Sequence, residues 1–188
     1  MADDFSRLVS LACHDLRTPL ATVHGFAKTM LRMDELEPEK RTRYLGLIDS
    51  SAEELASLLD LLSLAARIEG GRYDPVLREV DSLSLAPDGA AGTGAAVHVD
   101  PEPVERALAS FQRAASRHGG VETRIAVDGY RVSIEPVTAD AADVVLGESA
   151  KDLGALVGAR LVRALGGELA LEGERLTVTL PSAELASR

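Results

Sequence analysis

The sequence predicts an α plus α+β protein in which a hairpin of two long helices precedes an α/β sandwich. Two heptad patterns of apolar residues fill the first third of the chain, and an Asp-Gly pair separates two alternating stretches in the second half. A chain of 188 residues has room for one domain of ordinary size or for two small ones. We therefore expect two domains, at residues 1–72 and 73–188.

The composition narrows the classes of partner and compartment. The formal net charge is −10, the chain has three Phe, three Tyr and no Trp, and there is one cysteine. An acidic chain with few aromatic residues lacks the basic patches and stacking surfaces that nucleic acid requires. The apolar stretches are too short to cross a bilayer, and a single cysteine excludes an internal disulfide framework. We expect a cytoplasmic protein that acts on other proteins, without membrane or nucleic-acid partners.

An unbroken heptad pattern predicts the first helix. Apolar or small residues recur at alternating steps of four and three, at Phe5, Val9, Ala12, Leu16, Pro19, Val23, Phe26 and Met30. Pro19 falls inside this helix, where proline costs about 3 kcal/mol of helix stability and introduces a kink.

A second pattern of the same period predicts the partner helix. Its members are Leu45, Ile48, Ala52, Leu55, Leu59, Leu62 and Ala66. The polar connection carries Pro38, where a new helix can begin, and Gly70-Gly71 ends the helix. Two long helices joined by a short loop form an antiparallel hairpin, which cannot bury a heptad seam by itself. We therefore expect a homodimer whose two hairpins form a four-helix bundle.

The heptad places His14 on the outer face of the first helix. With Val9 at position a, His14 falls at position f, farthest from the seam, and Thr18 follows one turn later on the same face. Leu11 and Ala21 extend this face into a shallow surface around an exposed imidazole. A lone histidine on a helix is most often a solvated surface residue, so the neighbouring residues decide its interpretation.

Residues 13–20, CHDLRTPL, resemble the phosphoacceptor H-box of sensor histidine kinases, and the second helix is similar to the dimerisation helix of that family. The resemblance covers about residues 1 to 80. It implies that His14 is phosphorylated on a ring nitrogen and that Thr18 helps to place a water against a phosphorylated response regulator. It also implies that Asp15 orients or deprotonates the imidazole. Side chains at i and i+1 diverge on a helix, so pairing of Asp15 elsewhere is the alternative.

The second half reads as alternating helices and hairpins, which predicts a sandwich with helices on one face of a sheet. The expected helices are 101–118 and 152–165, and the expected strands are 121–127, 130–137, 168–171 and 176–180. Residues 81–99 are rich in Gly, Ala and Ser and read as a linker. Asp140, Asp143 and Glu148 read as a solvated acidic loop.

This order of elements resembles the ATP-binding domain of the same kinases, most closely at residues 161–169 and 177–181. Ser110 and Ala114 stand where that family carries the asparagines that hold Mg²⁺ and phosphate, and the family's Asp-x-Gly-x-Gly motif is absent. Hydroxyl and methyl groups cannot replace amide and carboxylate oxygens around Mg·ATP. Gly154 is all that remains of the glycine-rich turn. We expect a degenerate domain that binds no ATP, so that the protein has no cofactor or metal of its own.

These features predict a histidine phosphotransferase in a two-component phosphorelay. His14 would accept a phosphoryl group from the aspartate of a receiver domain and pass it to another response regulator, with Mg²⁺ supplied by the receiver. Leu11, Arg17 and Ala21 would form the docking surface. The alternative is a non-catalytic pseudokinase that binds a response regulator or assists its dephosphorylation through Thr18. A third interpretation is a histidine kinase with an unorthodox ATP site.

Overall fold

The computed structural model describes residues 2–33 and 35–183, with side chains from residue 6 onward. The chain forms two compact units, Met1–Ser63 and Leu64–Arg188. The division lies inside a helix, because the last turns of the second helix pack with the unit that follows.

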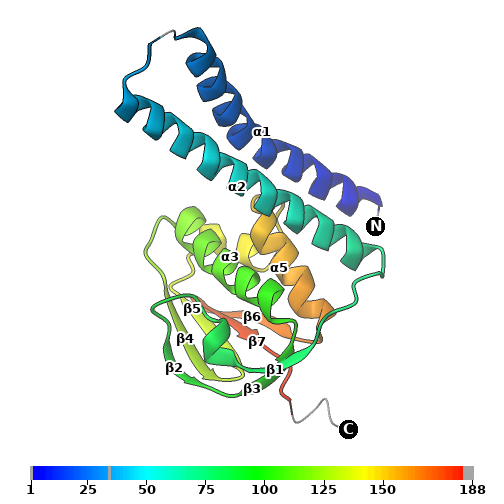
Figure 1. The fold of residues 1–188 in the computed structure, drawn as a ribbon. Coiled ribbons are helices and arrows are strands. Elements are labelled where there is room, and N and C mark those ends of the chain that lie inside the picture. The colour runs from blue at the N-terminus through cyan, green and yellow to red at the C-terminus, as the bar shows by residue number, and fades with distance from the viewer. Residues whose placement is uncertain (1, 34, 184–188) are drawn as a thin grey trace. The chain divides into compact units, whose positions relative to one another are not determined.

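The first unit is the predicted hairpin (Figure 1). Helix α1 spans Ala2–Arg32 and helix α2 spans Pro38–Glu69, so that Pro38 is the first residue of its helix, where its missing N–H costs nothing. The rings of Phe26 and Tyr44 lie 5.0 Å apart between centroids and join the two helices. The side chain of Phe5, the first member of the predicted seam, lies outside the described residues.

Helix α1 continues through Pro19 and changes direction along its length (Figure 1), as expected for a helix with an internal proline. Among the described residues, no helix combines the length and the apolar character needed to cross a membrane.

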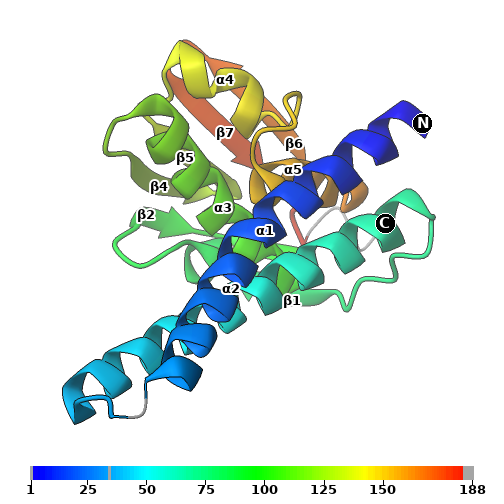
Figure 2. The ribbon, with the colours of Figure 1, turned by 90° about the horizontal axis from the view of Figure 1, so that it is seen from above.

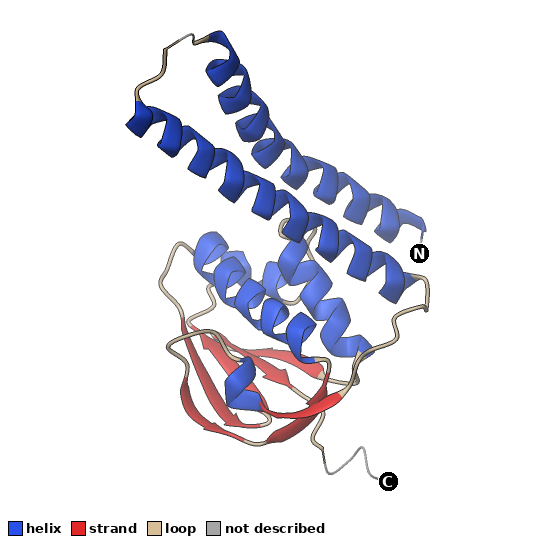
Figure 3. Ribbon diagram, viewed as in Figure 1, coloured by secondary structure: helices blue, strands red, loops and turns tan. Residues whose placement is uncertain are grey.

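The second unit is an α/β sandwich. Its elements in chain order are β1 (Arg78–Asp81), the 3₁₀ turn η1 (Ser82–Leu85), β2 (Ala91–Gly94), β3 (Ala96–Val99), α3 (Pro101–Gly119), β4 (Arg124–Gly129), β5 (Arg131–Glu135), α4 (Ala139–Val145), α5 (Leu153–Ala164), β6 (Glu168–Glu172) and β7 (Arg175–Thr179). The main sheet has the order β2-β4-β5-β7-β6, with β2 parallel to β4 and the other neighbours antiparallel. Strands β1 and β3 form a separate antiparallel pair. The helices of this unit cover one face of the main sheet (Figures 2 and 3).

Alternating apolar and polar residues along the strands place one face of the main sheet in the core of this unit. Apolar residues at every second position of β4, β5 and β7 are buried, and the positions between them are more exposed and mostly polar. The largest fully buried side chain is Phe111 on α3. The predicted hairpin joins β4 and β5, but Asp128 pairs with Arg131, so the two loop residues are Gly129 and Tyr130, and Gly129 adopts a positive φ of 60°.

Two predictions about the loops are wrong. Residues 81–99, expected to be a linker, contain η1, β2 and β3. Strand β2 has the sequence Ala-Gly-Thr-Gly and exists because it pairs with β4, a tertiary contact that propensity does not encode. A Cβ at Gly92 would overlap the carbonyl of Val127, so glycine is required there. The expected acidic loop is also wrong in part, because Asp140 and Asp143 lie in helix α4.

Candidate functional site

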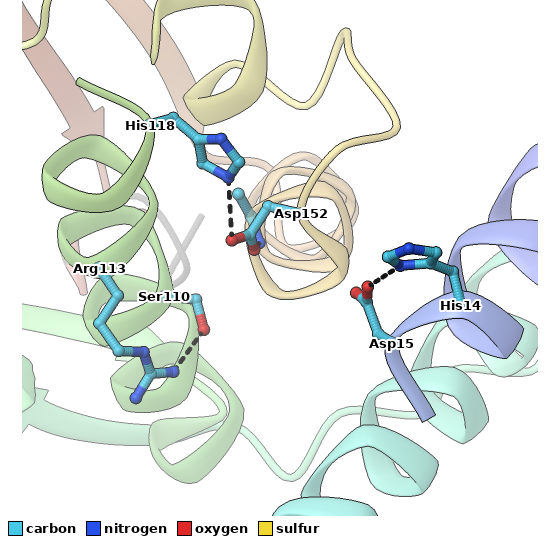
Figure 4. Close-up of polar contacts among 7 residues, drawn as sticks. His14, Asp15, Ser110, Arg113, His118 and Asp152 are labelled. Atoms are coloured by element: carbon cyan, nitrogen blue, oxygen red, sulfur yellow. Dashed lines mark hydrogen bonds and ion pairs between the residues drawn. The ribbon is translucent and has the colours of Figure 1, made fainter. Parts of the chain in front are cut away.

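His14 projects from α1 into solvent beside Asp15 (Figure 4). The His14 side chain is 77% exposed, and its Nδ1 lies 3.1 Å from Asp15 Oδ1. The Asp15 side chain is 28% exposed. The alternative that Asp15 pairs elsewhere because neighbouring side chains diverge is therefore wrong. Both side chains are short, and Nδ1 is the ring nitrogen nearer the backbone, so the carboxylate of the next residue can reach it.

This contact selects the tautomer of the imidazole. An ionised carboxylate can only accept a hydrogen bond, so in the neutral ring the proton resides on Nδ1 and is donated to Asp15. The lone pair then lies on Nε2, the nitrogen that points away from the contact. The arrangement presents a nucleophilic nitrogen, fixed in orientation, to a group that approaches from solvent.

The turn that follows His14 is shaped by Pro19. Proline has no N–H, so the Asp15 carbonyl loses its partner in the helical ladder. Thr18 is exposed, and its carbonyl accepts a hydrogen bond from Thr22 Oγ1 at 3.2 Å. Within the described part of the chain, the Thr18 hydroxyl itself makes no hydrogen bond, so it is available to solvent.

The three residues predicted to form the docking surface differ in exposure. Arg17 and Ala21 are exposed and lie on the same helix face as His14. Leu11 is 8% exposed, so the expectation that its side chain lies open on this surface does not match the structure. The assignment of the three residues to a partner interface stays a prediction.

In the second unit, the Ser110 hydroxyl is hydrogen-bonded to other residues of helix α3. The side chain is buried, its hydroxyl donates to the carbonyl of Arg106 at 2.7 Å, and it accepts from Arg113 Nη2 at 3.1 Å (Figure 4). Ala114, one turn further, is fully buried. These are the two residues predicted to replace metal-binding asparagines. Ser110 is therefore hydrogen-bonded within the protein, and Ala114 is packed in its interior.

Helix α5 packs closely against α3 at two of its glycines. A Cβ placed on Gly154 would lie 2.8 Å from Ser110 Oγ, and one on Gly158 would lie 3.1 Å from both Ala107 Cβ and Phe111 Cζ. Such distances are shorter than ordinary van der Waals contact. The glycines thus serve as packing positions that let the two helices approach closely.

Asp152 closes the N-terminal end of α5. Its Oδ1 accepts a hydrogen bond from the Ala155 amide at 3.0 Å, and its Oδ2 lies 3.6 Å from His118 Nε2 (Figure 4). The side chain is 15% exposed. The sequence signal for this contact was an aspartate directly before an apolar helical run, which is typical of an N-cap. The pairing with His118 had no signal, because it joins residues 34 positions apart.

Among the described residues, no group of three or more His, Cys, Asp or Glu side chains could hold a metal ion. Residues 6–71 match the family described as His Kinase A (phospho-acceptor) domain. Similar curated proteins include the sensor protein kinase PmrB of Pseudomonas aeruginosa, which is 34% identical over 80 residues, and the probable sensor histidine kinase TcrY of Mycobacterium tuberculosis, which is 32% identical over 106 residues.

The chain is much shorter than these relatives. The match to PmrB covers 43% of this chain and 16% of PmrB, and the match to TcrY covers 52% of this chain and 22% of TcrY. Among solved structures, the histidine kinase AdeS of Acinetobacter baumannii aligns with a TM-score of 0.62 at 17% identity, covering 90% of this chain and 98% of that one. The predicted fold class is confirmed: a helical hairpin that matches the His Kinase A family model is followed by an α/β sandwich with the fold of a histidine kinase ATP-binding domain.

Proposed function

We propose that this protein is a histidine phosphotransferase of a two-component phosphorelay. It takes a phosphoryl group from the aspartate of one receiver domain onto His14 and passes it to another response regulator. The observation that carries this proposal is the hydrogen bond from His14 Nδ1 to Asp15 beside an exposed Nε2. Phosphoryl transfer depends on positioning and charge neutralisation, and this pair supplies the positioning.

The transfer step balances without a further reactant. The Nε2 lone pair attacks the phosphorus of an aspartyl phosphate, an N–P bond forms, and the P–O bond to the aspartate breaks. The aspartate leaves as a carboxylate with the bonding electrons. The proton on Nδ1 stays in its hydrogen bond to Asp15, whose negative charge stabilises the positive charge that develops on the ring. The reverse step, on a second receiver, uses the same geometry.

We also propose that the second unit binds no Mg·ATP. The residues at the expected site do not fit the nucleotide: the Ser110 hydroxyl is already bonded to Arg106 and Arg113. Close packing of Gly154 on Ser110 supports this, as does the Asp152 carboxylate at the N-terminus of α5, where a phosphate would meet a like charge. The donor therefore has to be a phosphorylated protein, which supplies its own Mg²⁺.

The active form in this proposal is a homodimer. Several seam residues of the hairpin remain open in the single chain, among them Leu45 at 50%, Leu59 at 54% and Val9 at 37% exposure. Apolar side chains at heptad spacing that are left this exposed are typical of a helix–helix interface. Pairing of two hairpins as a four-helix bundle would cover them.

A second candidate function is assistance in dephosphorylating a response regulator, in a protein that binds its partner without taking the phosphoryl group. The free hydroxyl of Thr18, one turn from His14, favours it, because a hydroxyl there can orient a water. This candidate predicts loss of phosphate from the partner without labelling of His14.

The test uses receiver domains phosphorylated with radioactive phosphate and mixed with the full chain. We expect acid-labile, base-stable label on the wild type, none on His14→Ala, and slowed labelling of Asp15→Asn. Incubation with radioactive ATP and Mg²⁺ is expected to give no label.

Two other outcomes would each contradict one part of the proposal. Binding without label, with faster loss of phosphate from the receiver that Thr18→Ala abolishes, would replace phosphotransfer by the second candidate. Label on His14 from ATP alone would overturn the interpretation of the second unit.

A further inference from the structure

Strand β6 closes the main sheet with an open edge. It pairs with β7 on one side, from Glu168 to Glu172, and the sheet has no strand on its other side. In the part of the chain that the structure describes, no backbone hydrogen bond joins β6 to any segment except β7. An edge of this kind is a template on which another strand can pair.

The register of the hairpin determines which backbone groups the edge presents. A two-residue loop joins β6 to β7, and the paired residues Glu172 and Arg175 flank it. Such a loop is closed by a hydrogen-bonded pair, and hydrogen-bonded and open pairs alternate along an antiparallel ladder. Every second residue of β6, counted back from Glu172, is therefore bonded to β7. The two residues between them, Leu169 and Leu171, direct their N–H and C=O groups toward the open edge.

The side chains of this edge are apolar on one face of the sheet and acidic on the other. Leu169 and Leu171 are half-buried and lie opposite the buried core residues of β7. Glu168 and Glu172 are exposed on the other face, on either side of Ala170. The strand has no proline, no lysine and no bulge, the features that most often protect an edge from pairing.

The two acids disfavour a second copy of this chain at the edge. A twofold pairing that uses the free backbone groups of both leucines has its axis at Ala170. It places Glu168 directly opposite Glu172 of the other copy, and does so twice. Like charges directly opposite each other on paired strands are destabilising, whereas opposite charges there are stabilising.

We propose that the open edge of β6 is a docking site for an extended basic segment of a partner protein. The segment adds a sixth strand to the five-stranded sheet, and its backbone pairs with that of Leu169 and Leu171. Lysine or arginine at two positions four residues apart faces Glu168 and Glu172, and apolar residues between them cover the two leucines. This site belongs to the second unit, and it depends neither on His14 nor on the proposed function.

A groove at one end of β6 extends the acidic surface. It has a volume of about 600 Å³ and is lined by four glutamates, two arginines and Pro136. Arg175, one of the two arginines, is held by Glu135 at 2.7 Å. Glu172 and Glu174 line the same groove and are exposed. A basic side chain that faces Glu172 therefore enters a region of negative charge.

The test adds the synthetic peptide Lys-Val-Thr-Val-Lys to the isotope-labelled full chain and follows the backbone amides by NMR. We expect shifts at the amides of Leu169 and Leu171, with slower hydrogen exchange there. The peptide Glu-Val-Thr-Val-Glu should cause no such shifts. Unchanged β6 amides at saturating concentrations of the basic peptide would overturn the proposal.

A charge exchange tests the role of the acids. Glu168→Lys/Glu172→Lys should weaken binding of the basic peptide about tenfold and allow the acidic peptide to bind. The matched control is Asp140→Lys/Asp143→Lys, which makes the same change in net charge at two exposed acids of α4. Equal weakening by the control pair would assign the effect to net charge and contradict the proposal.

Two substitutions of one residue separate backbone pairing from side-chain contact. Leu171→Pro removes an N–H at the open edge, where a sheet tolerates proline, and should abolish peptide binding. Leu171→Ala keeps that N–H and should still bind. Circular dichroism checks that both variants fold, and the charge exchange remains decisive if the proline variant does not. Shifts at the same amides that grow with protein concentration in the absence of peptide would assign the edge to a second copy and overturn the proposal.

Discussion

The proposed dimer makes a quantitative prediction at Leu45 and Leu59. Both side chains lie on the predicted seam of α2, and about half of each is open to solvent in the single chain, 50% and 54%. Full burial of a leucine side chain is worth about 1.5–3 kcal/mol, so the half that remains exposed can contribute about 1 kcal/mol on dimerisation. A twofold interface uses each position twice.

The double variant Leu45→Ser/Leu59→Ser should therefore weaken the dimer by about 4 kcal/mol, or roughly a thousandfold in Kd. Sedimentation equilibrium over a wide concentration range measures this change directly. The matched control is Leu77→Ser, which alters a leucine of similar exposure, 44%, in the second unit. The control should leave Kd unchanged.

Two results would refute this reasoning. A wild-type chain that stays monomeric at high concentration would leave the seam without its proposed partner. A stable dimer that the double variant does not weaken would place the interface elsewhere, even if the chain dimerises. Circular dichroism on the same samples separates loss of pairing from loss of helix.

Three further predictions concern single contacts. Gly158→Ala should destabilise the second unit in urea denaturation by about 1 kcal/mol, since overpacking against α3 outweighs the gain in helix propensity. Tyr73→Phe removes a 3.0 Å hydrogen bond to Asp100 and should cost about 1 kcal/mol at neutral pH. Burial and this hydrogen bond raise the pKa of Tyr73, so the stability that the tyrosine confers is complete below the ordinary tyrosine pKa and declines above it. The difference in unfolding free energy between the wild type and Tyr73→Phe should therefore shrink when denaturation is repeated in alkali. Asp15→Asn should slow labelling of His14 without unfolding the hairpin, because an amide can still contact the ring but carries no charge.

Sequence periodicity predicted the elements whose signals are local. The heptads gave both long helices, and Asp128-Gly129 gave the hairpin of β4 and β5. The segment before α3 was missed because β2 owes its conformation to pairing with β4, and its composition is that of a loop. Helix α4 was missed because seven residues, two of them charged, are too few for a helical period to emerge.

In the candidate site too, the position of a residue on its helix could be predicted from the sequence, but its contacts could not. His14 could be placed on the outer face from the heptad alone, and its exposure of 77% agrees with that. The partner of Asp15 could not be derived, because neighbouring residues on an ideal helix point about 100° apart and only rotamers decide whether they meet. Burial of Leu11 was equally out of reach, since a helical wheel reports direction but not what covers a face.

The boundary between the two units also depends on a contact between residues far apart in the sequence. The glycine pair after Glu69 marks the end of α2 and suggests a cut near residue 72, but an ion pair ties the last turn of α2 to the unit that follows. Glu69 lies 2.6 Å from Arg160 of α5, whose side chain is only 11% exposed. Asp100, at the start of α3, accepts hydrogen bonds from the Tyr73 hydroxyl and the Val76 amide. Cutting the chain at the glycines would take the carboxylate of Glu69 away from a nearly buried guanidinium, and breaking such a pair costs several kcal/mol. The end of α2 is therefore a structural part of the sandwich, and a fragment meant to fold without the hairpin has to begin no later than Leu64.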